Sequence, residues 1–138
     1  RTADARAMAE RTIALDPGYH LAYSHLLNIY QGVGGQFSDL VFDGDSILAL
    51  LGEADVRAYG GRERVRASQE RARALATSAA RGWVAADPDS RQAHMALVIS
   101  HSAAQRFDSA AAAADRAAAR AGMRAPALAY AAVQMHFL

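Results

Sequence analysis

Two matching segments, each of which interrupts a helical pattern with the dipeptide Asp-Pro, constrain the fold of this chain more than any other feature. Residues 13–23 read IALDPGYHLAY, and residues 84–94 read VAADPDSRQAH. Proline lacks a backbone N–H and restricts the residue before it, so one helix must end at each Asp-Pro and another must begin shortly after it. Pro17 and Pro88 lie 71 residues apart in the 138-residue chain. An internal repeat of this kind predicts helical hairpins stacked into a solenoid.

Apolar residues recur at spacings of three and four on both sides of these turns, which is typical of amphipathic helices. The expected helices cover residues 3–15, 20–31, 62–86, 91–104, 108–121 and 126–138. Between them, glycines break the pattern, and we interpret residues 32–61 as an irregular insertion with one short helix at 47–51. The chain is therefore expected to be all-α and to form a single helical repeat domain over residues 1–138.

The helix after each Asp-Pro resembles helix A of the tetratricopeptide repeat, a family built from helix–turn–helix units of about 34 residues. Two triplets carry the family's spacing: Tyr23, Leu26 and Tyr30, and, with histidines in place of the aromatics, His94, Leu97 and His101. Residues 105–110, QRFDSA, look like the family's turn into helix B. The resemblance covers residues 1–31 and 84–138 and fails across 32–66.

The resemblance implies a right-handed α-solenoid of antiparallel hairpins, of which this chain is expected to be a fragment. The distance between the prolines fits one repeat with a large insertion, or two repeats with a degenerate middle one. We favour the insertion, because residues 62–86 read as one elongated helix B.

The resemblance also implies a concave face lined by the A helices, where an extended peptide or a partner helix is commonly held. The side chains expected on that face lie opposite the packing positions of each helix: Ser24, Asn28 and Gln31, and one repeat later Gln92, Met95, Ile99 and Ser102. Met95 and Ile99 are four residues apart, so together they would seat an apolar side chain of the partner. A competing hypothesis is that the insertion folds over this face and fills it from within.

Composition argues against several other classes of function. The net charge is +1, with 15 arginines, no lysine and 14 acidic residues, which argues against nucleic acid as the partner. No apolar run approaches the ~20 residues needed to span a bilayer. The glycine-rich stretch at 32–35 is not followed by the Gly-Lys-Ser/Thr of a P-loop, and no catalytic constellation stands out. We therefore expect no cofactor and no enzymatic activity, and the sequence indicates no compartment.

Metal binding is not expected either. His94 and His101 share a helix face, but as metal ligands they would need a third partner, so we interpret them as packing residues. The acidic residues between Asp39 and Asp55 lack the ligand spacing of an EF-hand and are interpreted as a polar turn with a helix cap.

The expected function is protein–protein interaction. Two alternatives stay open: a regulatory or sensory domain attached to an enzyme outside these residues, and binding of an anionic ligand or nucleic acid through the arginines of the 62–81 helix. Trp83 is expected to be buried against the following hairpin. The apolar residues Met135, Phe137 and Leu138 predict self-association through uncapped ends of the array.

Overall fold

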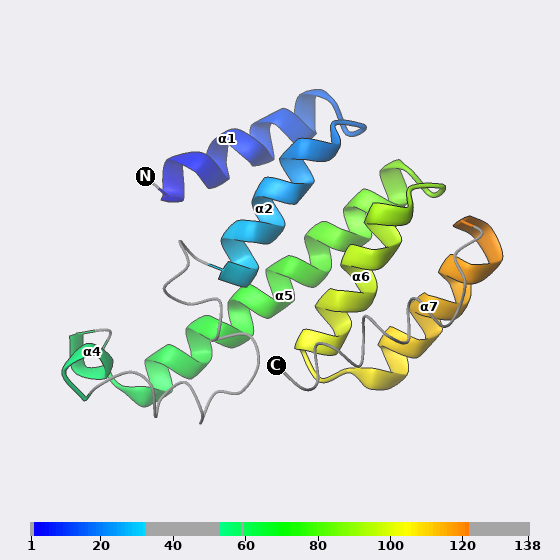
Figure 1. Cartoon of the computed structure of the whole chain (residues 1–138). Coiled ribbons are helices and arrows are strands. Elements are labelled where there is room, and N and C mark those ends of the chain that lie inside the picture. Colours follow the sequence, from blue (N-terminus) through cyan, green and yellow to red (C-terminus); the bar gives the residue numbers. More distant parts are fainter. Residues whose placement is uncertain (1, 33–52, 59, 122–138) are drawn as a thin grey trace.

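A computed structural model describes residues 2–32, 53–58 and 60–121, and all of its regular structure is helical in these ranges. The helices are α1 (Thr2–Leu15), α2 (His20–Gly32), α4 (Glu53–Ala58), α5 (Arg62–Ala86), α6 (Arg91–Ala103) and α7 (Phe107–Ala121) (Figure 1). Five of the six predicted long helices are confirmed to within one residue at each end. The helices expected at 47–51 and 126–138 lie outside the described residues.

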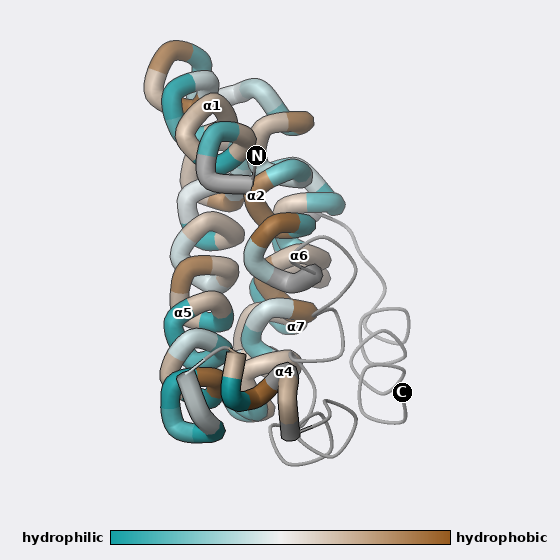
Figure 2. Tube along the Cα trace, turned by 90° about the vertical axis from the view of Figure 1, so that its left-hand side faces the viewer, coloured by the Kyte–Doolittle hydropathy of each residue, from teal (hydrophilic) through white to brown (hydrophobic). Residues whose placement is uncertain are grey.

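The five long helices lie side by side in chain order, and each runs opposite to the one before it (Figure 1). The main contacts join α1 to α2, α2 to α5, α5 to α6 and α6 to α7. The long helix α5 therefore packs on both α2 and α6. Figure 2 shows strongly hydrophilic residues on the end of α5 beside α4, where arginines are frequent in the sequence.

The two Asp-Pro turns have the same backbone hydrogen bonds. The amide of each aspartate, Asp16 or Asp87, donates to the carbonyl four residues earlier, at 2.8 Å in the first turn and 2.9 Å in the second. Three residues later, the amides of Tyr19 and Ser90 donate back to the aspartate carbonyl, at 3.1 Å in both turns. The repeated sequence thus gives a repeated turn, which sets the direction in which α2 and α6 leave it.

The helices after these turns bury side chains at the same positions. Five buried residues of α2 match five buried residues of α6 at an interval of 71: Ala22, Tyr23, Leu26, Leu27 and Tyr30, and Ala93, His94, Leu97, Val98 and His101. On the helices packed against them, α5 buries Ala76 and Ala80, and α7 buries Ala110, Ala113 and Ala117. Alanine lets helix backbones approach closely, so this core depends on close packing of small side chains.

Trp83 is buried, as expected, with 4% of its surface exposed, and the stacking and hydrogen bonding of its indole involve the preceding helix α2. The indole stacks on Tyr23 of the preceding helix α2, with ring centroids 5.6 Å apart and planes 3° from parallel. Its Nε1–H donates a hydrogen bond to Nδ1 of His20 at 2.8 Å. The sequence predicted packing against the following hairpin, and it did not indicate these two contacts with α2.

Part of the predicted irregular insertion at 32–61 is helical, because residues 53–58 form α4 and α2 extends to Gly32. Val56 of α4 is buried, and α4 packs on α5. Two glycines end α4 in the left-handed region, Gly60 at φ 91° and Gly61 at φ 98°. The Gly61 amide donates to the Val56 carbonyl at 2.8 Å, a bond typical of a glycine-ended helix.

Candidate functional site

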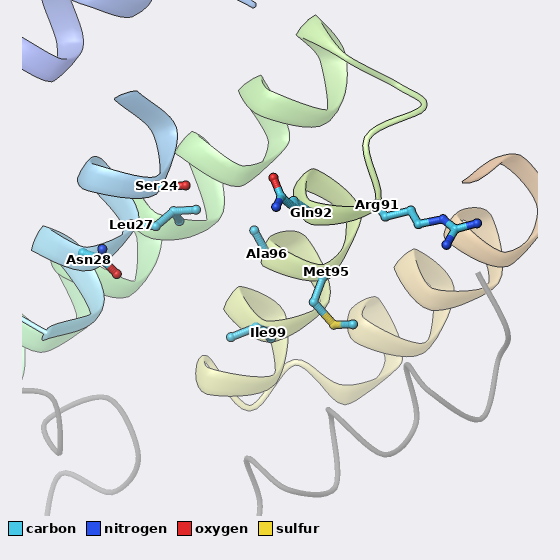
Figure 3. A pocket seen from close by; sticks show the side chains of 8 residues that line it. All are labelled: Ser24, Leu27, Asn28, Arg91, Gln92, Met95, Ala96 and Ile99. Carbon is cyan, nitrogen blue, oxygen red and sulfur yellow. The ribbon is translucent and has the colours of Figure 1, made fainter. Parts of the chain in front are cut away.

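An open groove of about 410 Å³ lies between α2 and α6, with α5 behind it (Figure 3). Three residues of α2 and five of α6 line it: Ser24, Leu27 and Asn28, and Arg91, Gln92, Met95, Ala96 and Ile99. In this view Leu27 and Ala96 approach from the two sides of the groove, whereas Arg91 and Met95 project from α6 toward the side of α7. The two helices that line it are those expected to line the concave face.

Five of the seven predicted site residues line this one groove: Ser24, Asn28, Gln92, Met95 and Ile99. The side chain of Gln31 lies outside the described residues. Three lining residues, Leu27, Ala96 and Arg91, were not predicted to belong to the site. Leu27 is both buried and part of the groove wall.

Ser102 does not line the groove and is instead buried, with 7% of its surface exposed. Counting along the helix from Met95 placed it on the open face. However, Ser100, His101, Ser102 and Ala103 are all buried, so the last turn of α6 has no open side before the chain turns into α7. Helical periodicity predicts which face of a single helix is apolar, but it does not predict where neighbouring elements bury the end of that helix on all sides.

The groove combines an apolar wall with polar groups and one charge. Leu27, Met95, Ala96 and Ile99 are buried or half-buried, so they offer apolar surface without being closed off. Ser24, Asn28 and Gln92 supply a hydroxyl and two amides, which both donate and accept hydrogen bonds. Arg91 is the one charged side chain in the lining, and the lining contains no carboxylate.

His94 and His101 pack inside the molecule, which confirms the packing interpretation. The His94 ring is 5% exposed, and its Nε2–H donates to the carbonyl of Pro88 at 2.6 Å, which fixes the start of α6 against the turn. Burial lowers the pKa of His101, with a smaller contribution from the charges of Arg81, Arg106 and Arg116. Across the described residues, no group of three or more histidine, aspartate or glutamate side chains is arranged to hold a metal ion.

Outside the groove, the side chains of His20, Trp83 and Asp87 form a polar group that joins α2 to α5. Because the Trp83 indole only donates, Nδ1 of His20 must accept, and the neutral ring carries its proton on Nε2. That Nε2 lies 3.3 Å from Oδ2 of Asp87. Both ring nitrogens are thus engaged, so the group ties the two helices together. Sequence spacing could not have revealed it, because His20 and Trp83 are 63 residues apart.

The arginines of α5 share the helix with two acidic residues. Arg64 and Arg71 are exposed, but the exposed carboxylates Glu63 and Glu70 lie on the same helix. Arg73 is half-buried and has interactions within the molecule. In the part of the chain that the structure describes, no helix is both long enough and apolar enough to cross a membrane.

Comparisons of the chain with protein-family models, with curated proteins and with solved structures each gave no match.

Proposed function

We propose that this chain is a protein-interaction module of tetratricopeptide-like helical hairpins, which holds an extended segment of a partner in the groove between α2 and α6. The observation that carries the proposal is that five residues predicted to contact a partner line a single open groove between the two helices that follow the Asp-Pro turns.

Two matched features support a repeat of hairpins. The turns share their hydrogen bonds at an interval of 71 residues, and the buried positions of α2 and α6 match at the same interval. In this interpretation α2 and α6 are A helices, and α1, α5 and α7 are B helices. The right-handed superhelix of the family is part of the proposal.

The lining of the groove favours a peptide over a small rigid ligand. Its apolar surface comes from four side chains on two helices, and its uncharged polar side chains are two amides and a hydroxyl that can bond a peptide backbone. An extended backbone has free N–H and C=O groups, whereas a helix uses nearly all of its own. The polar residues of the groove are therefore useful to an extended partner and largely unused by a helical one.

The experiment is a double substitution, Met95→Ala with Ile99→Ala, tested against peptides selected on the 138-residue chain from a phage library of random nine-residue sequences. We expect the dissociation constant to rise about tenfold or more, because two apolar contacts of the groove are removed. Circular dichroism checks that the variant remains folded.

The matched control is Met8→Ala with Leu15→Ala, which removes similar side chains from α1 outside the groove, where they are 71% and 79% exposed. Binding by this control should be unchanged. If the folded groove variant binds as tightly as the parent, the groove is not the site of interaction.

A further inference from the structure

We infer that the segment held in the groove is acidic, with a carboxylate near Arg91 and an apolar side chain three or four residues away from it. This inference rests on the proposed function and specifies the chemistry of the partner.

The first step is the charge of the groove. Arg91 is exposed, and within the described part of the chain no hydrogen bond or ion pair engages its guanidinium. Other arginines are paired: Arg6 with Glu10 at 2.8 Å and Arg120 with Asp89 at 3.5 Å. Since no carboxylate lines the groove, the Arg91 guanidinium is the one charge at the edge of its apolar surface, on the side toward α7. A partner with a carboxylate is complementary to it, and one with a lysine or arginine there is disfavoured.

The second step is the spacing along α6. Arg91, Met95 and Ile99 follow each other at intervals of four residues and all line the groove. With a rise of about 1.5 Å per residue, the Cα atoms of Arg91 and Ile99 are separated by roughly 12 Å along the axis. An extended peptide advances about 3.3 Å per residue, so it covers this distance in three to four residues. A helical partner would need about eight residues.

The third step is the place of each side chain. Figure 3 shows Arg91 where α6 begins, with its side chain directed toward the side of α7, and Ile99 farther along the same helix. The apolar anchor of the peptide would lie against Met95 and Ile99, and its carboxylate would lie within reach of the long arginine side chain. A space of about 410 Å³ has room for only a few residues, which agrees with a short recognition element.

The experiment uses the nine-residue peptides selected on the whole chain, labelled with fluorescein and measured by fluorescence polarisation. We expect the selected peptides to share an Asp or Glu three or four residues from a Leu, Ile, Met or Phe. Arg91→Gln should weaken their binding about tenfold, as loss of one charged hydrogen bond does. A peptide in which lysine replaces the acidic residue should bind the parent chain more weakly. The same peptide should regain part of the lost affinity when it is tested against the Arg91→Glu variant.

The matched control is Arg71→Gln, an exposed arginine of α5 that does not line the groove. It changes the net charge equally and should leave affinity within about twofold. Thermal unfolding of each variant checks that the fold is retained.

Two results would overturn the inference, and they are distinguishable. If Met95→Ala with Ile99→Ala abolishes binding while Arg91→Gln does not, the groove binds peptides but not through an acidic residue. If no peptide is selected, or the selected peptides are insensitive to both variants, the proposed function fails as well.

Discussion

The single tryptophan offers the sharpest test of how this helical array is held together. Trp83 is 4% exposed, stacks on Tyr23 and donates its indole N–H to His20. These contacts join α5 to α2, although Trp83 and His20 are 63 residues apart in the sequence. Replacing Trp83 therefore tests the contact between two helices that local sequence cannot bring together.

The expected cost can be worked out from these contacts. A buried aromatic removes roughly 150–250 Å² from water, which at about 25 cal/mol per Å² corresponds to about 4–6 kcal/mol as an upper estimate. Truncations of Phe or Trp to Ala in cores cost about 3–5 kcal/mol, so we expect Trp83→Ala to lower the free energy of unfolding by about that amount. Trp83→Phe keeps an aromatic ring and loses the indole N–H, so we expect a cost of about 1–2 kcal/mol.

A double-mutant cycle separates the hydrogen bond from the packing. His20→Ala leaves the indole N–H of Trp83 buried without a partner, which costs about 1–3 kcal/mol. In the Trp83→Phe background that donor is absent, so the same change at His20 should cost about 1 kcal/mol less. The assay is urea unfolding followed by far-ultraviolet circular dichroism, because the variants that replace Trp83 contain no tryptophan whose fluorescence could be followed.

Two results would contradict this reasoning. A cost below about 1 kcal/mol for Trp83→Ala would show that the ring is accessible to water. Equal costs for His20→Ala in both backgrounds would show that the hydrogen bond contributes nothing measurable.

Three further predictions concern other parts of the molecule. Burial lowers the pKa of His101 from 6.5, so as the pH falls below 6.5 the unfolded chain binds a proton at this residue before the folded chain does. The free energy of unfolding should therefore decline from pH 6.5 down to the lowered pKa. Urea unfolding should show that this decline is absent in His101→Gln and persists in His25→Gln, which alters an exposed residue. Ser90 caps α6 by accepting from the Ala93 amide at 3.2 Å, so Ser90→Ala should cost about 1 kcal/mol by thermal unfolding, and Ser78→Ala on the exposed side of α5 less than about 0.5. Self-association should appear in light scattering and decrease when the exposed Met8 and Leu15 are both changed to Glu, whereas a monomer at high concentration would contradict it.

The helices and turns were predictable because they depend on residues close in sequence. Proline, the cap at Ser90 and the three-to-four spacing of apolar residues act within one or two turns of helix. The bounds of α5 were predicted to the residue, since glycines at its start and Asp-Pro at its end leave little choice. The helix α4 was missed because six residues are too few to show an apolar period.

The groove was predictable in part for the same reason. Which side of α2 or α6 faces outward follows from which side is apolar, and this placed Ser24, Asn28, Met95 and Ile99 correctly in the groove lining. The other lining residues could not be predicted, because they depend on the distance between α2 and α6. That distance is set by the packing of both helices on α5. Leu27 and Ala96 reach the groove because that separation leaves a gap, and Ser102 is excluded because the end of α6 is enclosed.

The matched positions of the two helices give the groove a direction. Ser24 corresponds to Met95 and Asn28 to Ile99 at the repeat interval of 71, and all four line the groove. One wall is therefore polar where the other is apolar, although the backbone turns that position them are the same. Along an extended peptide, successive side chains point to opposite faces while the backbone groups lie at the edges. Such a peptide gains most when its apolar side chain meets α6 and a backbone edge meets the hydroxyl and amide of α2. The matched turns orient α2 and α6 alike, and the differences between their exposed residues would determine how a partner lies in the groove.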